Sequence, residues 1–276
     1  MNEAVVYHEN HDMQKTAVRS TLFRHLPEMQ LDKKKNLKIL DMGCGPGDLT
    51  LELLNLIPNT EKMVGIDKSD AMIDFANTHY QCKDERLHFK KEDIYCVDTK
   101  YSQFDAVFSF FVLQWVNQRK AVTNIYNVLK PGGQVLLLFI SDSPNYELIS
   151  QLALTRKWSP YLKDYSPKRF NDETPDIAII MEQLGFNITT CLNENKSHAF
   201  SKEKYYGTRV VLILEWTKAL ISPINPFLQD IPRCQLEDFE EDLKKIIPEN
   251  KNICFNNSKN EVTFNFRTLT IIANKI

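Results

Sequence analysis

The chain has 276 residues, of which 43% are apolar and 25% are charged, and its formal net charge is −2 at pH 7. These values are typical of a globular protein. Because there is no excess of positive charge, the composition disfavours a nucleic-acid-binding protein. The six cysteines form no C-x-x-C pair and have no companion histidines at ligand spacing. We therefore expect neither a zinc site nor a disulfide framework, and assign no metal.

The sequence carries no clear signal for secretion or membrane insertion. The N-terminal stretch MNEAVVYHENHDMQ is too polar for the apolar core of a signal peptide. No apolar run reaches the roughly 20 residues that cross a bilayer. Free thiols indicate a reducing compartment, so we expect a cytoplasmic protein with no membrane span.

We expect residues 1–36 to form an N-terminal helical segment ahead of a core at residues 37–140. In that core, short apolar runs alternate with amphipathic segments, which is typical of βαβ units in a parallel sheet. The predicted strands are LKILDMG (37–43), KMVGID (62–67), LHFKKED (87–93), FDAVFSFF (104–111) and QVLLLFI (134–140). The predicted helices lie at 48–57, 70–80 and 118–129.

Residues 141–276 are predicted to complete the same single domain with helical cap insertions and the last two strands. The predicted helices lie at 145–157, 172–185, 202–221 and 233–247, and the predicted strands at 187–196 and 261–273. The fold class is therefore α/β and Rossmann-like: a mostly parallel sheet of seven strands, with helices on both faces and a cap over the strand C-terminal ends. Aromatic residues are frequent in the cap segments, which suits an apolar pocket, although they could equally form the core of the cap itself.

A glycine-rich turn, GCGPG, follows the first predicted strand, and Asp41 stands just before it. Glycines there let a ligand approach the main chain. A nicotinamide dinucleotide would favour G-x-G-x-x-G or -A, but the last position here is Asp48. Asp41 would also repel a pyrophosphate, whereas it would attract the ammonium group of S-adenosylmethionine. The charge pattern thus favours S-adenosylmethionine as the cofactor.

Acids also stand at the ends of the next two predicted strands. Asp67 is placed to accept hydrogen bonds from two ribose hydroxyls, a role that either cofactor class offers. Asp93 could accept from an adenine amino group, and the Ile94 amide could donate to a ring nitrogen. A nicotinamide-dependent dehydrogenase remains an alternative because Asp67 would bind its ribose equally well.

The stretch ILDMGCGPGDLT, followed in order by VGIDKSDAMIDFA, FDAVFSFFVLQWV and VLKPGGQVLLLF, resembles the class I S-adenosylmethionine-dependent methyltransferases. Within them the chain is similar to the insect juvenile hormone acid methyltransferases. That resemblance extends to DMQ, LQWVNQRKAVTNIYNVLKPGG, SPNYELI and INPFL.

The resemblance implies a set of site residues. Gln14 and Trp115 match the pair that holds the substrate carboxylate, and both side chains offer N–H donors. Related enzymes often have histidine before this tryptophan, whereas this chain has Gln114. The expected cofactor-binding residues are Asp41, Gly43, Cys44, Gly45, Asp67, Lys68, Met72, Asp93, Ile94, Ser109 and Phe110.

The implied reaction is methyl transfer from S-adenosylmethionine to the carboxylate of an isoprenoid acid, farnesoic acid or juvenile hormone acid. A carboxylate is already ionised at pH 7, so we expect no general base and assign none of the six histidines. The alternative is a paralogue that binds cofactor or lipid without efficient turnover. The preferred acid and the oligomeric state, monomer or homodimer, stay open.

Overall fold

A computed structural model describes residues 3–97, 103–163, 165, 176–201, 230–256, 258–259 and 261–276. The helix expected at 202–221 and the INPFL motif lie outside the described residues. None of the helices within the described ranges combines the length and apolar character needed to span a membrane.

A single sheet forms the centre of the molecule, with strand order β3-β2-β1-β4-β5-β8-β6. Strands β1 to β5 pair in parallel, and β8 and β6 add two antiparallel strands at one side. The main strands are β1 (Leu37–Met42), β2 (Thr60–Asp67), β3 (Leu87–Lys91), β4 (Phe104–Phe110), β5 (Leu129–Asp142), β6 (Phe186–Ser201) and β8 (Glu261–Lys275). The mostly parallel α/β fold is thereby confirmed.

Helices cover both faces of the sheet because its central strands are apolar on both sides. Leu53 of α3 (Asp48–Leu56) and Leu22 of α2 (Asp12–His25) pack in one core cluster. Ile125 of α5 (Gln118–Val128) and Met181 of α7 (Asp176–Leu184) pack in a cluster on the opposite face. The helix α4 (Asp70–His79) packs beside β2 and β3.

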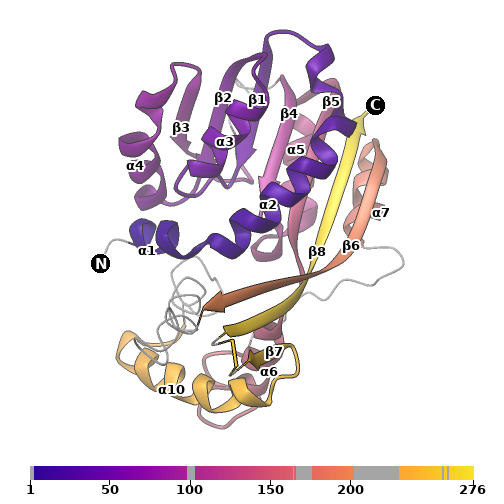
Figure 1. The fold of residues 1–276 in the computed structure, drawn as a ribbon. Coiled ribbons are helices and arrows are strands. Elements are labelled where there is room, and N and C mark those ends of the chain that lie inside the picture. The colour runs from indigo at the N-terminus through magenta and orange to yellow at the C-terminus, as the bar shows by residue number, and fades with distance from the viewer. Residues whose placement is uncertain are drawn as a thin grey trace.

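A second lobe lies beyond the sheet, and β6 and β8 run from the sheet into it (Figure 1). It contains α6 (Pro144–Ala153), α10 (Leu236–Ile246) and a short strand β7 (Ile253–Asn256) that pairs with β8. The short strand β7 was not predicted, so the expected count of seven strands is wrong: within the described part of the chain the sheet has eight. This lobe lies in the part of the chain where the cap was expected, and its apolar core includes Trp158 and Phe239 together with Met13 of α2.

The N-terminal segment begins at the end of the sheet where β1 and β4 have their carboxyl ends (Figure 1). It consists of α1 (Glu3–Asn10), α2 and two short turns, η1 (Leu26–Met29) and η2 (Leu31–Lys33). Ala4 of α1 packs on Met72 and Phe75 of α4. The remaining short turns are η3 (Gln81–Lys83), η5 (Leu113–Trp115), η6 (Arg233–Gln235) and η7 (Ile247–Glu249).

Candidate active site

The glycine-rich turn joins β1 to α3 and is fixed to the neighbouring strand β2. The amides of Gly43 and Cys44 both donate to the carbonyl oxygen of Ile66, at 2.8 and 2.9 Å. Gly43 has φ 78°, and a Cβ added there would lie 2.2 Å from Cγ2 of Val112. Only glycine meets both constraints, which explains the residue type at the start of the turn.

Gly45 lies at the middle of the turn with φ 54°. A Cβ added there would meet only the ring of Tyr7, with Cε1 at 3.8 Å, so the backbone at Gly45 is close to the N-terminal helix. Burial, together with the charges of Asp48 and Asp67, raises the pKa of Tyr7 well above its ordinary value. This tyrosine stays neutral and was missed by the sequence analysis.

Asp67, at the end of β2, faces the turn. Its Oδ2 accepts a hydrogen bond from the Gly45 amide at 3.1 Å, and its Oδ1 accepts one from the Ser69 amide at 2.9 Å. Burial raises the pKa of this carboxyl, and hydrogen bonds from the backbone together with the charge of Lys68 partly offset the rise. Each oxygen retains a second acceptor site, which suits two ribose hydroxyls.

Asp41, at the end of β1, is only 2% exposed. The Thr50 hydroxyl donates to its Oδ2 at 2.7 Å. Burial raises the pKa of Asp41 to about 7, and the nearby charges of Asp67 and Asp48 add to the rise. Within the described part of the chain, no lysine or arginine forms an ion pair with Asp41 or Asp67. A cationic ligand group would lower the electrostatic cost of both carboxylates.

Two further expected cofactor residues, Asp93 and Ile94, lie in the loop after β3. Asp93, after β3, is exposed, and its Oδ1 accepts from the Tyr95 amide in a local turn. The carbonyl oxygen of Ile94 accepts from Asn124 Nδ2 at 2.7 Å, which ties this loop to α5. Both residues follow β3 at the edge where β1 and β2 end.

The remaining expected cofactor residues are mostly buried. The Ser109 hydroxyl donates to the carbonyl oxygen of Met42 and so joins the ends of β4 and β1. Burial also raises the pKa of the Cys44 thiol well above its ordinary value, so this cysteine is not a reactive thiolate. Met72 and Phe110 are buried, whereas Lys68 is exposed.

The two residues expected at the substrate carboxylate lie on different elements. Gln14 is half-buried on α2, and its Oε1 is buried with no hydrogen-bond partner among the described residues. Trp115 is half-buried in η5. Nearby, Gln114 Nε2 donates to the carbonyl oxygen of Phe111 at 2.8 Å. Because Phe111 has φ 59°, Gln114 supports a strained turn.

Asp48 is the centre of a polar cluster that the sequence analysis did not foresee. Its Oδ2 lies 3.0 Å from His11 Nε2 and 2.8 Å from Lys15 Nζ. Burial alone would raise the pKa of Asp48, but His11 and Lys15 outweigh burial and hold it well below the ordinary value. In the sequence, Asp48 is notable only as a mismatch to a dinucleotide-binding motif. Its partners lie more than 30 residues upstream, so no local spacing points to them.

Comparison with known proteins decides the family. Residues 39–133 match the model of a methyltransferase domain. The chain is 32% identical to juvenile hormone acid O-methyltransferase from Bombyx mori, over all of this chain and 98% of that protein. The chain belongs to the juvenile hormone acid O-methyltransferase family. It is thus an S-adenosylmethionine-dependent methyltransferase, as the glycine-rich turn and the acids predicted.

Two further comparisons agree with this family assignment. The juvenile hormone acid O-methyltransferase from Drosophila melanogaster is 30% identical over 90% of this chain and 83% of that protein. Among solved structures, the YcgJ protein from Bacillus subtilis matches with a TM-score of 0.56 at 15% identity, covering 90% of this chain and 96% of that one. The structural match supports the Rossmann-like fold. Membership of the family places the chain among the class I methyltransferases.

Proposed function

We propose that this enzyme transfers a methyl group from S-adenosylmethionine to the carboxylate of an isoprenoid acid, farnesoic acid or juvenile hormone acid, and so forms a methyl ester. The observation that carries this proposal is the end-to-end match to the Bombyx mori protein, whose name states that reaction on juvenile hormone acid. The match covers the cap segments as well as the cofactor core, so it is more than a likeness of fold, which alone does not define a function.

The residues at the strand ends fit the cofactor. Asp67 would accept from the ribose hydroxyls, and the buried carboxylate of Asp41 would take the ammonium group of the methionyl part. The open backbone at Gly45 leaves room for the ligand beside Tyr7. We also assign adenine contacts to Asp93 and to the Ile94 amide. When bound, the cofactor supplies an electrophilic methyl group on a sulfonium ion.

The protein has little proton chemistry to perform in this reaction. Carboxylic acids have ordinary pKa values near 4, so the nucleophile is ionised without a general base. The chain's own work is to align the carboxylate with the methyl carbon and to exclude water. For well-oriented reactants, alignment alone can supply about 7–11 kcal/mol of the barrier.

Gln14 and Trp115 are proposed to hold the substrate carboxylate through neutral N–H donors. The buried, unpartnered end of the Gln14 amide supports this role. The oxygen and nitrogen of an amide are interchangeable by a flip, so an incoming carboxylate would meet the NH2 end. A neutral grip holds the anion without neutralising it, which preserves its nucleophilicity.

The cap is proposed to receive the isoprenoid tail, but its largest aromatics have another role. Trp158 and Phe239 are 1% and 0% exposed and pack edge to face in the core of the cap. The partly buried side chains Tyr161 and Phe200 at the border of that core are better placed to contact a ligand. Aromatic content alone therefore overstates the size of an apolar pocket in the cap.

We propose one domain over residues 1–276, because β8 and β6 complete the sheet that β1 begins.

We also propose a cytoplasmic location. All six cysteines are free, which suits a reducing compartment.

An assay with labelled S-adenosylmethionine tests the substrate proposal. Farnesoic acid, juvenile hormone acid and a straight-chain fatty acid are compared, and the ester is identified by mass spectrometry. We expect methyl ester from at least one isoprenoid acid at a kcat/KM well above that for the fatty acid. No ester from either isoprenoid acid would contradict the proposal.

The same assay tests the carboxylate-binding pair. Gln14→Ala and Trp115→Phe should each lower kcat/KM by about tenfold or more, since each removes a hydrogen bond to a charged group worth about 1.5–3 kcal/mol. Gln81→Ala, at an exposed position in η3, is the matched control. Retention of the wild-type kcat/KM by both site variants would remove these residues from the site.

A further inference from the structure

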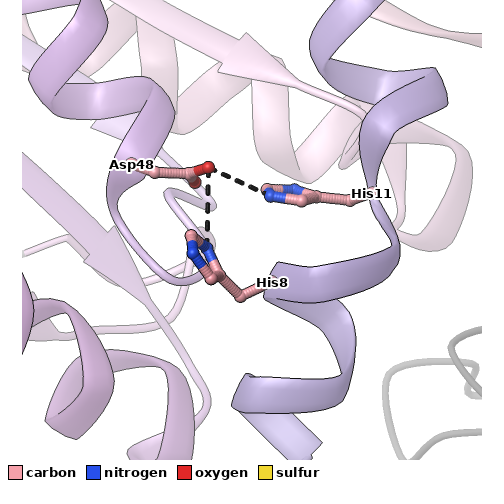
Figure 2. Close-up of side chains that lie close together, drawn as sticks. All are labelled: His8, His11 and Asp48. Atoms are coloured by element: carbon pink, nitrogen blue, oxygen red, sulfur yellow. Dashed lines mark hydrogen bonds and ion pairs between the residues drawn. The ribbon is translucent and has the colours of Figure 1, made fainter.

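Three side chains with metal-ligating atoms meet where the N-terminal segment touches the helix that follows the glycine-rich turn (Figure 2). His8 comes from α1, His11 from the junction of α1 and α2, and Asp48 from the first turn of α3. His8 Nδ1 lies 3.6 Å and His11 Nε2 3.0 Å from Asp48 Oδ2. One ligand atom from each side chain falls within 4.8 Å of the other two.

The cluster contains two buried polar atoms that its neighbours do not satisfy. His8 Nδ1 and Asp48 Oδ1 have no hydrogen-bond partner among the described residues. Polar atoms buried without a partner are rare in native structures and indicate a missing group. Both atoms are buried although 29% of the His8 side chain is exposed, so bulk water does not readily supply that group.

The surroundings of His8 indicate which kind of group is missing. Its other ring nitrogen, Nε2, lies 3.4 Å from the Tyr80 hydroxyl. If Nε2 carries the hydrogen and donates to that hydroxyl, Nδ1 presents a lone pair toward the Asp48 carboxylate. A lone pair facing an anion is repulsive unless a cation lies between them. A hydrogen-bond partner on the far nitrogen is also the usual arrangement for a histidine that binds metal.

We propose that His8, His11 and Asp48 form a binding site for a divalent transition-metal ion of the zinc type. Two imidazole nitrogens and one carboxylate oxygen are ligands that zinc accepts, and a water molecule would complete four-fold coordination. With metal–ligand distances of about 2.0–2.1 Å, tetrahedral ligands lie about 3.3 Å apart. The separations of 3.0 and 3.6 Å in the cluster lie on either side of that value.

Lys15 is the group that competes with the metal. Its Nζ lies 2.8 Å from Asp48 Oδ2 and is the only lysine ammonium among the described residues paired with this carboxylate. A metal must displace this ammonium or bind through the unpartnered Oδ1. The proposal therefore makes an unusual prediction: loss of Lys15 should strengthen metal binding.

The site would connect two parts of the cofactor region. His8 and His11 follow Tyr7 in the N-terminal segment, and the ring of Tyr7 lies next to Gly45. Asp48 comes directly after the glycine-rich turn. A bound ion would hold the N-terminal segment against the glycine-rich turn. It is a structural clamp in this proposal and takes no part in methyl transfer.

Direct metal binding tests the proposal without any assay of activity. The chelator-stripped protein is titrated with Zn2+ against a chromophoric chelator, and with Co2+ while the visible spectrum is followed. We expect one ion per chain and a Co2+ spectrum without a thiolate charge-transfer band. That band matters because five of the six cysteines are exposed and could bind metal themselves. Only ligation by nitrogen and oxygen supports the cluster.

Variants then locate the ion. Removing a group that hydrogen-bonds to a metal-binding side chain lowers metal affinity by about 10- to 100-fold. Tyr80→Phe should therefore weaken binding by that factor, and His8→Ala or Asp48→Ala by at least as much. Lys15→Met should tighten binding, while His88→Ala on β3 should leave it unchanged. Circular dichroism confirms that each variant is folded, and the gain of affinity in Lys15→Met cannot arise from unfolding.

Three results would overturn the proposal. The first is no stoichiometric binding of Zn2+ or Co2+ by the wild type. The second is binding that His8→Ala and Lys15→Met leave unchanged. The third is a Co2+ spectrum dominated by thiolate ligation, which would assign the ion to the cysteines.

Discussion

Asp67 at the end of β2 and Asp242 on α10 are both held by hydrogen bonds, yet their pKa values move in opposite directions. Hydrogen bonds from Lys157 and Lys245 hold the pKa of Asp242 at about 2, with a further contribution from the Trp158 indole. Burial raises the pKa of Asp67, which has only backbone donors among its hydrogen-bond partners. Asp242 is paired with two lysines in the cap, whereas the half-buried Asp67 forms no ion pair among the described residues. We propose that the cofactor completes the environment of Asp67.

The same contrast holds for the aromatic residues of the two regions. In the cap, Trp158 and Phe239 pack on each other and stabilise a local core. At the strand ends, Tyr7 packs beside the open backbone of Gly45. Trp158 and Phe239 are thus used by the packing of the cap itself, whereas we propose that the groups at the strand ends contact the cofactor.

The largest effect is expected at Gly43. Gly43→Ala adds a methyl group that would clash with Val112 and places alanine at φ 78°. Strain and overpacking each cost about 1–3 kcal/mol, so we expect a loss of 2 to about 6 kcal/mol in the free energy of unfolding and loss of cofactor binding. Chemical denaturation and calorimetry with S-adenosylhomocysteine measure both.

Gly132→Ala is the matched control for this substitution. Gly132 has φ 70°, but a Cβ there would meet nothing within 4 Å. It should cost only the backbone strain, about 1–3 kcal/mol, and should leave cofactor affinity unchanged. Equal losses in the two alanine variants would show that the contact with Val112 is unimportant.

Phe239→Ala should separate stability from cofactor binding. Removing a fully buried phenylalanine from the cap core costs about 3–5 kcal/mol, so denaturant unfolding should shift strongly. The affinity for S-adenosylhomocysteine should change little, because none of the expected cofactor residues belongs to the cluster in which Phe239 packs. A parallel loss of cofactor affinity in the folded variant would break the distinction between the two regions.

Asp41 should make stability depend on pH. Its pKa is about 7 in the folded chain against an ordinary value of 3.8, so the folded chain holds more protons than the unfolded chain between these values. Stability therefore falls as pH rises from about 4 to about 7. Asp41→Asn should flatten this slope and should be more stable than the wild type above pH 7, by at most about 4 kcal/mol.

Cofactor binding should reverse part of that effect. An ammonium group beside Asp41 would lower the pKa of its carboxyl, so S-adenosylhomocysteine should release a proton on binding near pH 6–7. Calorimetry in buffers of different ionisation enthalpy measures this release, and Asp41→Asn should lack it. The same number of protons released by both proteins would place the ammonium elsewhere.

The smallest effect is expected at Asp242. Asp242→Ala removes partly exposed pairs with Lys157 and Lys245 and should cost about 1–2 kcal/mol of stability. Because the pKa of Asp242 is lowered, this contribution is present above pH 4 and is lost as pH falls toward 2. Urea unfolding at pH 7 and pH 3 checks both points. A similar loss at both values would show that its ionisation is unimportant.

The core strands could be predicted because their signals are local. The apolar runs of β1, β2 and β4 and the glycine-rich turn lie close together in the sequence, and their spacing alone defines a parallel sheet with a ligand at its carboxyl edge. The elements that were missed depend on distant partners. The four residues of β7 form a strand only because they pair with β8, and β6 continues to Ser201 for the same reason.

The site residues show the same difference between local signals and distant contacts. Asp41 and Gly43 belong to one local motif and Asp67 ends the next strand, so their places at the ends of β1 and β2 could be predicted. Asp48 faces His11 and Lys15, which are separated from it by 37 and 33 residues along the chain, and no periodicity connects them. The aromatic residues of the cap segments suited a pocket by type, but Trp158 packs against Phe239 in the cap core, a contact that no local pattern indicates.

The most direct test of the contrast between Asp67 and Asp242 is the affinity of S-adenosylhomocysteine for two isosteric variants. Asp67→Asn should raise the Kd by about tenfold or more, because hydrogen bonds to a charged acceptor are worth about 1.5–3 kcal/mol. Asp242→Asn should leave the Kd unchanged. Equal affinities in the wild type and Asp67→Asn would contradict the claim that the buried acids of the strand ends are completed by the cofactor.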